Sequence, residues 1–400
     1  MTFGMKYAVL RLIILALAML SQIYIFVHIH RIIRSSHKSG RFKTLASLAV
    51  GTVIFSLFAL NLYFLVIPVP WPDPSRAVQY MLFYPSAVWG IGSVFSALLL
   101  CLFQATGAVA KAAARTYRDL AGKEMPETVN EGRRHFLQAG LSGVAAAPLL
   151  LCGYSAVSTG RDCDVQKLTL PFGRSLRAVQ LTDIHAGIYM NRKEIQYYTE
   201  RVIALQPDLL LLTGDYISNS LSFLPDCLEE MARVQTRYGT FATLGNHEHW
   251  YGALTDIEAI FSRYDITLLH NTNRVIHTGH GPFAIAGIDD LRAGCPDLGA
   301  ALHGLDQTIP KILLSHRPEI FPDAALMGIH LTLAGHYHGG QIKLHLPGGD
   351  FSLAHLRTLY PEGLFRINDS RLYVSRGIGT TFTPVRLNAP PEITMLHLKG

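Results

Sequence analysis

The chain has 400 residues, of which 49% are hydrophobic and only 16% charged, and its mean hydropathy of +0.24 is too high for an ordinary soluble enzyme of this length. Residues 1–160 contain 14 Lys and Arg against 5 Asp and Glu, whereas the remainder contains 21 against 24. The positive charge therefore flanks apolar segments instead of forming a basic surface on a folded domain, which argues against nucleic-acid binding.

Four apolar segments of near 20 residues occupy the first part of the chain, at about 12–29, 45–69, 80–105 and 136–157. Each is long enough to cross a bilayer core of about 30 Å. We therefore expect residues 1–158 to form a membrane region with about four transmembrane helices, and residues 159–400 to form a separate globular domain. These segments contain few charges, so anchoring is a simpler role for them than transport.

The loops between these segments differ in charge. The first loop contains Arg31, Arg34, Lys38, Arg41 and Lys43, the second contains only Arg76, and the third is basic again. By the positive-inside rule, the first and third loops are cytoplasmic. This predicts a multi-pass protein of a bacterial-type inner membrane with the globular domain on the extracytoplasmic face.

The fourth segment allows two interpretations. Residues 133–157 begin with two arginines, followed by a Gly- and Ala-rich apolar stretch, "RRHFLQAGLSGVAAAPLLL". This pattern is typical of a twin-arginine export signal, but an ordinary transmembrane helix with basic residues at its inner end has the same features. Both interpretations place the following domain outside.

From Leu168 onward, apolar strand-like runs alternate with helix-like segments, a pattern that favours an α/β domain. One predicted helix begins after Asn191, a suitable N-cap, with Glu194 three residues later. The late strands "RLYVSR" and "EITMLHL" have no long helix between them. They predict a partly antiparallel, sandwich-like arrangement.

Several of these strands end in polar residues, which are Asp183, His185, Asp215, Asn246, His247, His316, His336 and His338. The carboxyl ends of strands in open α/β sheets gather at one edge, so we expect these residues to meet. Carboxylate, imidazole and amide ligands without thiolate suit Mn, Fe or Zn. Glycines precede Asp215, Asn246 and His336, and we expect them to let the backbone turn sharply.

These motifs resemble those of the calcineurin-like metallophosphoesterase superfamily. The five blocks are D-x-H, G-D, G-N-H-E, a strand-end His and G-H-x-H, and they occur in the order of that family. The stretches "AGHYHGGQIKL" and "SRGIGTTFTPVRLNAPPEITMLHL" resemble its membrane-associated branch, which includes UDP-2,3-diacylglucosamine hydrolases. The resemblance covers about residues 168–398 and implies a β-sandwich flanked by helices, preceded here by the transmembrane region.

The resemblance also implies roles for individual residues. One divalent metal ion would be held by Asp183, His185 and His338, and a second by Asn246, His316 and His336, with Asp215 bridging the two. A hydroxide held between the metals would attack phosphorus in line. His247 matches the non-ligand histidine of the family and is expected to be the general acid or transition-state stabiliser.

Three features are less informative. Glu248 replaces the Asp that many family members have after this histidine, and its role stays open. His249 matches no family position and is expected at the surface or behind the ligands. A disulfide between Cys227 and Cys295 is possible but cannot be inferred from spacing.

The expected function is a membrane-anchored phosphoesterase that hydrolyses a phosphodiester, pyrophosphate or phosphomonoester, on a lipid or cell-envelope substrate close to the bilayer. One alternative is a UDP-2,3-diacylglucosamine-type pyrophosphate hydrolase in lipid A synthesis, although such a substrate is expected in the cytoplasm. An alternative from another class is a non-catalytic metal-binding membrane sensor or scaffold. The sequence leaves the metal identity and the oligomeric state open.

Overall fold

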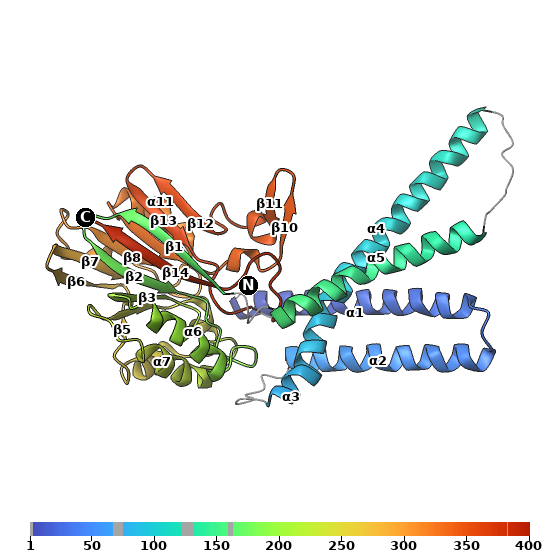
Figure 1. Ribbon diagram of the computed structural model, residues 1–400, viewed down its shortest axis with the longest axis horizontal. Helices are drawn as coiled ribbons and strands as arrows, with labels where there is room; N and C mark the ends of the chain where they lie inside the picture. The colour runs from blue at the N-terminus through green and yellow to red at the C-terminus, as the bar shows by residue number, and fades with distance from the viewer. Residues whose placement is uncertain (1–2, 67–74, 122–130, 159–162, 382) are drawn as a thin grey trace. The chain divides into compact units, whose positions relative to one another are not determined.

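The computed structural model describes residues 3–66, 75–121, 131–158, 163–381 and 383–400. The chain divides into two compact units. One consists of Met1–Val69 and Tyr80–Ala156, and the other of Pro70–Gln79 and Val157–Gly400. Figure 1 draws the first in blue to green and most of the second in green to red.

The first unit is helical. Its elements are α1 (Phe3–Ser35), α2 (Gly40–Val66), most of the π-helical turn η1 (Gln79–Phe83), α4 (Tyr84–Ala121) and most of α5 (Glu131–Ser158). The short α3 (Arg76–Val78), which precedes η1, is assigned to the second unit. Among the described residues, three segments are long and apolar enough to cross a membrane, namely Leu12–Ser35, Gly40–Tyr63 and Gln79–Leu120. Large apolar side chains such as Leu12 and Phe55 are exposed on these helices, as expected for surfaces that face lipid.

The fourth predicted segment also forms a helix, α5. Within its described residues, the apolar part is Gly143–Ala156, which is shorter than a bilayer-spanning segment. A fourth transmembrane helix and the boundary at residues 158–159 therefore stay predictions.

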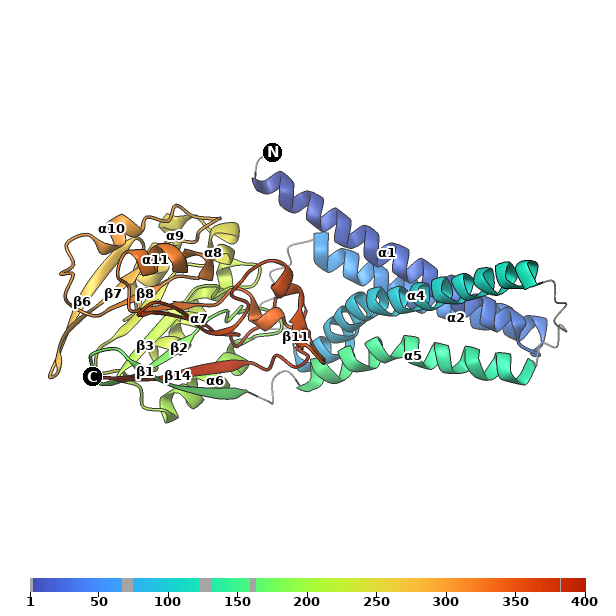
Figure 2. The same ribbon diagram turned by 90° about the horizontal axis from the view of Figure 1, so that it is seen from above.

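The second unit contains two large mixed sheets in the described part of the chain. The first has the order β1-β14-β2-β3-β4-β5 and the second the order β12-β13-β9-β8-β7-β6. The first consists of β1 (Asp164–Pro171), β2 (Leu176–Leu181), β3 (Leu209–Thr213), β4 (Thr240–Thr243), β5 (Thr267–Leu268) and β14 (Glu392–Lys399). The second consists of β6 (Thr272–Thr278), β7 (Gly281–Gly287), β8 (Lys311–Leu314), β9 (Leu331–Ala334), β12 (Gly363–Ile367) and β13 (Ser370–Val374). The expected α/β sandwich is confirmed, and Figure 2 shows β1, β14, β2 and β3 side by side.

Both sheets contain parallel and antiparallel pairs. Strands β2, β3 and β4 are parallel, as are β7, β8 and β9. The late strands β13 and β14 belong to different sheets, and β14 runs antiparallel to β2. A third, two-stranded sheet is formed by β10 (Lys343–Leu346) and β11 (Gly349–Ser352).

Helices cover the outer faces of the two large sheets. The α-helices are α6 (Arg192–Ala204), α7 (Leu224–Ala232), α8 (Asn246–Tyr251), α9 (Leu254–Phe261), α10 (Leu298–Leu302) and α11 (Phe321–Leu326). The 3-10 turns are η2 (Leu221–Phe223), η3 (Pro318–Ile320), η4 (His338–Gly340) and η5 (Leu353–Leu356). The predicted N-cap is confirmed, because the Asn191 side chain accepts hydrogen bonds from the amides of Lys193 and Glu194.

The sequence of strand β3 is apolar throughout because both faces of the strand are buried. Leu209 and Leu211 pack between the two sheets, whereas Leu210 and Leu212 pack beneath α6, α7 and α9. Because successive side chains of a strand point to opposite faces, a strand buried on both faces needs no polar positions. Both faces are thus fixed by packing, which holds the end of the strand rigidly.

The two cysteines considered for a disulfide are both free. Cys227 is buried in α7 and Cys295 is exposed. The pairing that the sequence left open is therefore not formed.

Candidate metal centre

The polar residues lie directly after parallel strands of both sheets. Asp183 and His185 follow β2, and Asp215 follows β3. His316 and His336 follow β8 and β9, which belong to the second sheet. The expectation that these strand ends meet is met by the structure, and each of these side chains is buried or largely buried.

Much of this cluster has an unusual backbone conformation. The left-handed region, which non-glycine residues seldom adopt, is occupied by Asp183, His185, Asp215, His336 and His338, with φ between 52° and 75°. Each such residue costs about 1–3 kcal/mol, and such strain concentrates at functional sites. The buried strands before these turns supply the packing that holds them.

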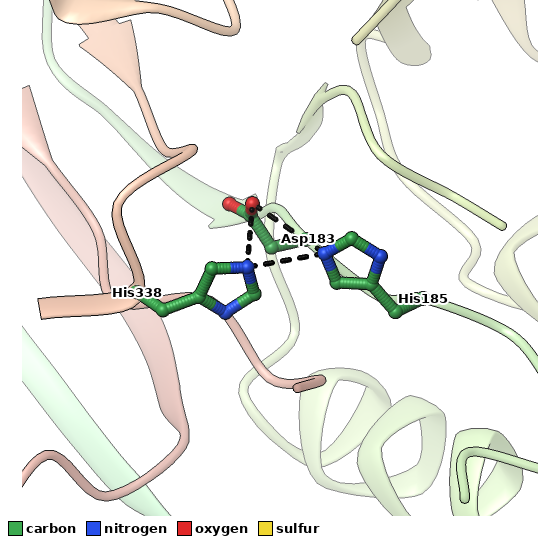
Figure 3. A group of neighbouring side chains, drawn as sticks. All are labelled: Asp183, His185 and His338. Carbon is green, nitrogen blue, oxygen red and sulfur yellow. Dashed lines mark hydrogen bonds and ion pairs between the residues drawn. The ribbon is translucent and has the colours of Figure 1, made fainter. Parts of the chain in front are cut away.

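The first group of ligand atoms comes from the ends of β2 and β9. His338 Nε2 lies 3.2 Å from Asp183 Oδ1 and 3.1 Å from His185 Nε2. Figure 3 shows the two rings and the carboxylate turned toward one another. These three residues form a group that could hold one metal ion.

The second group lies beside the first. His316 Nε2 lies 3.1 Å from Asp215 Oδ2 and 3.1 Å from His336 Nδ1. The His316 ring is oriented from behind, because its Nδ1 lies 2.9 Å from the carbonyl oxygen of Thr213. Asp215, His316 and His336 form a second group that could hold a metal ion.

Asp215 faces both groups. Its Oδ2 atom lies 3.1 Å from His316 Nε2 and 3.7 Å from His185 Nε2. A carboxylate in this position can share its charge between two cations about 3.5–4 Å apart. The clustered Asp and His donors are therefore compatible with a dinuclear metal centre.

The pKa directions of the clustered residues agree with that fit. Burial lowers the pKa of His185 to about 3, and burial lowers that of His338 well below its usual value, so their lone pairs are free to bind a metal. Burial disfavours the charged form of His316, but the nearby Asp215 carboxylate outweighs it and raises the pKa to about 10. The Asp215 carboxylate therefore favours positive charge on the facing His316 ring.

His247 is close to the same carboxylate from the other side. Its Nε2 lies 4.0 Å from Asp215 Oδ2, and its Nδ1 lies 2.7 Å from the carbonyl oxygen of Ser218. The carbonyl fixes the Nδ1–H tautomer, so Nε2 faces the site. His185, Asp215 and His247 also form a third possible metal group, and burial lowers the pKa of His247.

The glycines before three of these residues serve different purposes. Gly214 has φ +88°, as a sharp turn requires. Gly245 has an ordinary extended backbone, and a Cβ there would lie 2.3 Å from Asp215 Oδ1. A Cβ on Gly335 would lie 2.2 Å from Asp183 Oδ2. The turn explanation is thus wrong for Gly245 and Gly335, which are needed because a carboxylate packs directly against the backbone.

Glu248 has a role that the sequence left open. Its carboxylate accepts backbone N–H groups of Asp215, Tyr216 and Gly245 at 2.8–3.0 Å, and of Ile217 at 3.3 Å. It is fully buried and ties the loop after β3 to the loop after β4. Glu248 therefore positions the proposed bridging residue.

Arg317 was not identified from the sequence, although it directly follows His316. Its guanidinium is buried, donates from Nε to Asp290 at 2.9 Å, and donates from Nη2 to Asn246 Oδ1 at 2.9 Å. Its Nη1 contacts His336 Nε2. Arg317 thus connects Asn246, the remaining proposed ligand, to the second group.

Two further residues contact the first group from the C-terminal part of the chain. Thr381 Oγ1 lies 3.1 Å from His185 Nε2 and 2.8 Å from His338 Nε2. Arg386 Nη2 lies 3.1 Å from His338 Nδ1. No spacing rule in the sequence would have identified either residue, because both approach the site only through tertiary packing.

His249 belongs to a separate ionic cluster. Its Nε2 lies 2.5 Å from Asp289 Oδ1, and His270 Nε2 lies 3.1 Å from Asp289 Oδ2. Only 14% of the His249 side chain is exposed, so it is closer to a buried ion-pair partner than to a surface residue. Hydrogen bonds to Asp289 raise the pKa of both histidines.

This cluster predicts pH-dependent stability. A raised histidine pKa stabilises the fold fully below the unfolded value of about 6.5, and this contribution is lost as pH rises through the folded pKa. Burial would raise the pKa of Asp289, but its histidine partners lower it, so its contribution is present above about 3.9 and is lost at lower pH. In buffer that contains a metal chelator, His249→Gln should therefore lower the melting temperature, relative to the wild type, more at pH 5–6 than at pH 9.

Thermal unfolding followed by circular dichroism measures this difference. The exposed His280, on the turn between β6 and β7, provides the control. His280→Gln should show no such pH dependence. An equal loss of stability for His249→Gln at both pH values would contradict the ion-pair assignment.

Comparisons with known proteins agree with this geometry. The family model described as calcineurin-like phosphoesterase matches residues 176–340, which include every proposed ligand. The chain is 30% identical to the phosphodiesterase YaeI of Escherichia coli over 66% of this chain and 98% of that protein. It is 28% identical to the metallophosphoesterase YkuE of Bacillus subtilis over 67% of this chain and 98% of that protein.

A relative from Bos taurus, named transmembrane protein with metallophosphoesterase domain, is 32% identical over 58% of this chain and 54% of its own length. The chain thus matches nearly the whole of the two bacterial proteins and about half of the bovine one. The mixed sheets, the buried His and Asp groups and these matches agree with one another. The chain belongs to the calcineurin-like phosphoesterase family and is a metal-dependent phosphoester hydrolase.

Proposed function

We propose that this protein is a membrane-anchored dinuclear phosphoesterase whose substrate is a phosphodiester, pyrophosphate or phosphomonoester of a lipid or of the cell envelope. The observation that carries the proposal is the position of Asp215 Oδ2, which faces histidine nitrogens of both candidate metal groups. One carboxylate oxygen that faces histidine nitrogens of two adjacent donor groups is suited to bridging a pair of cations.

When bound, two divalent cations, which we expect to be Mn, Fe or Zn, supply an activated water and neutralise negative charge on the phosphoryl group. The chain contributes their position. Asp183, His185 and His338 would hold one cation, and Asn246, His316 and His336 the other. Glu248 holds the backbone of the proposed bridging residue Asp215, and Arg317 holds the side chain of Asn246 in the second set.

His247 is the proposed catalytic residue. Its Nδ1 is held by the carbonyl oxygen of Ser218, so its Nε2 points toward Asp215 and carries any proton that is exchanged with substrate. Burial keeps the free ring neutral, and an incoming phosphoryl group would favour its protonated form. The protonated ring would stabilise the leaving oxygen and donate its Nε2 proton to it.

Membrane attachment favours a substrate in or near the bilayer, because an anchored site meets lipid phosphoesters at a high effective concentration. The relative named phosphodiesterase YaeI supports a phosphodiester among the three bond types. The UDP-2,3-diacylglucosamine-type pyrophosphate stays the second candidate, and it requires the domain to face the cytoplasm.

The side of the membrane on which the domain lies is also part of the proposal. The basic loops around residues 31–43 and 111–134 favour a cytoplasmic position for both, and hence an extracytoplasmic domain. A fusion of alkaline phosphatase after Gly400 should be active, and a fluorescent-protein fusion at the same position should be dark. The reverse pattern would place the domain in the cytoplasm and favour the nucleotide-linked substrate.

Hydrolysis of bis-p-nitrophenyl phosphate by the purified full-length chain, loaded with Mn²⁺, tests the activity itself. Asp215→Asn keeps the shape of the side chain but removes its charge from both cation positions. We expect at least ~10³-fold slower turnover, since several kcal/mol of charge stabilisation is lost. Metal analysis should show fewer bound ions. Two tightly bound ions without turnover in the wild type would instead support the sensor hypothesis.

His247→Ala should separate catalysis from metal binding. Because Nε2 of this residue is proposed to act on substrate, we expect turnover to fall by about 10²–10⁴-fold. Metal content should stay near that of the wild type. A His247→Ala protein that loses its metal ions would show instead that this histidine is a ligand, as its place in the third possible metal group allows.

A further inference from the structure

The small sheet β10–β11 exposes an unusual number of large apolar side chains. Together with η5 it forms a segment outside both large sheets, which we call the apolar hairpin, residues 343–359 (Figure 1). Its exposed apolar residues, with their exposed fractions, are Leu344 (51%), Leu346 (50%), Phe351 (37%), Leu353 (66%), Leu356 (70%) and Leu359 (84%). A concentration of exposed large apolar side chains in one short segment of a folded domain usually marks an interaction site.

The hairpin separates apolar and polar side chains. Leu344 pairs with Phe351 across the two strands, and Leu346 lies two residues along from Leu344, so these three share one face. The opposite face carries Lys343 and Asp350. Lys343 binds Glu362, and its Nζ lies 3.7 Å from Asp350. The hairpin is thus held by ion pairs on one face, whereas its other face has large exposed side chains.

The root of the hairpin lies where the chain enters the domain. Strand β1 begins at Asp164, which binds Arg376 at 2.9 Å. Arg376 and Glu362 both pack against Gly339, where a Cβ would lie 2.9 and 2.3 Å from them. Glu362 in turn binds Lys343 at the base of the hairpin. The entry point of the chain and the apolar hairpin therefore share one edge of the domain.

The shared edge indicates what covers the apolar hairpin. In the sequence, only residues 159–163 join α5 to β1. The same chain carries, among its described residues, three helices long and apolar enough to span a bilayer. With α5 as the last helix of the membrane region, as the sequence predicts, so short a connection keeps its point of attachment close to the lipid surface. The apolar hairpin, rooted at this point, is therefore within reach of the bilayer interface, where exposed Leu and Phe side chains are stabilised.

The hairpin is also connected to the candidate metal centre. Gln341 lies between His338 and the first residue of β10, and its Nε2 donates to the carbonyl oxygen of Thr381 at 3.3 Å. Thr381 Oγ1 lies 2.8 Å from His338 Nε2. The hairpin and the metal-binding edge are thus neighbouring parts of one domain.

We propose that the apolar hairpin inserts into the lipid–water interface of the bilayer that holds the chain and thereby presents the metal-binding edge to phosphoester headgroups. The choice of substrate rests on the proposed function, whereas the docking itself does not. A covering protein partner and a freely exposed hairpin are the outcomes that would contradict it.

Tryptophan fluorescence in the full-length chain tests the docking. Leu346→Trp places an indole on the apolar face, where Leu346 is 50% exposed. Leu326→Trp places one at the end of α11, where Leu326 is 87% exposed, near the amino end of β9 and so at the opposite edge. Both variants are reconstituted in nanodiscs of phosphatidylcholine and phosphatidylglycerol, with or without brominated phosphatidylcholine, and the wild-type signal is subtracted.

The added emission of Leu346→Trp should be blue-shifted and quenched by the brominated lipid, whereas that of Leu326→Trp should be neither. A red-shifted, unquenched signal from Leu346→Trp would overturn the proposal. A blue-shifted but unquenched signal would also overturn it, because it would indicate a cover other than lipid.

A second measurement separates docking from catalysis. The substitutions Leu344→Gln and Leu346→Gln together should slow hydrolysis of hexadecyl p-nitrophenyl phosphate dispersed in the nanodiscs by about tenfold, as effective concentration is lost. Turnover of soluble bis-p-nitrophenyl phosphate should not change, and Leu326→Gln should affect neither substrate. Equal rates on the lipid substrate would contradict the role of the hairpin. A wild type inactive on both substrates with an intact quenching result would contradict the proposed function and leave the docking supported.

Discussion

The candidate metal centre depends on the burial of several carboxylates and imidazoles beside one another. The buried carboxylates repel each other unless a cation or a proton lies between them. Asp183 and Asp215 are both buried, and burial raises the pKa of Asp183 to about 6. The facing histidines are held in place by carbonyl oxygens, by Arg317 and by Arg386. Divalent cations would offset the cost of burying these carboxylates beside the facing imidazoles.

The two large sheets provide the rigidity that this arrangement requires. Left-handed backbone at five proposed ligand positions is costly, and it persists because β2, β3 and β9, which precede these positions, are almost wholly buried. Glu248 adds a second constraint, since its carboxylate collects amides from two loops. Glu248, at the position where many family members have Asp, is therefore compatible with the site. Its longer side chain accepts hydrogen bonds from backbone amides and is not one of the proposed metal ligands.

The proposed function and the apolar hairpin share one physical basis. A phosphoesterase attached to a bilayer gains by keeping its metal-binding edge at the headgroup level, where lipid phosphoesters are concentrated. Lys343 on the polar face of the hairpin is paired with Glu362 and Asp350. The exposed Leu and Phe side chains of the other face therefore determine which kind of surface the hairpin binds. The apolar hairpin would then both bind the bilayer and orient the metal-binding edge toward the lipid headgroups.

The sequence by itself determined the fold class, the family and the set of ligand types, because strand periodicity and the five ordered motifs are local patterns. It also indicated an N-terminal membrane region from hydropathy alone. Only the tertiary structure decided which atoms meet: that Asp215 faces both groups, that Gly245 and Gly335 make room for carboxylates, and that Arg317, Thr381 and Arg386 contact the histidines. These contacts join residues up to 196 positions apart and depend on how two sheets pack, which no local pattern encodes.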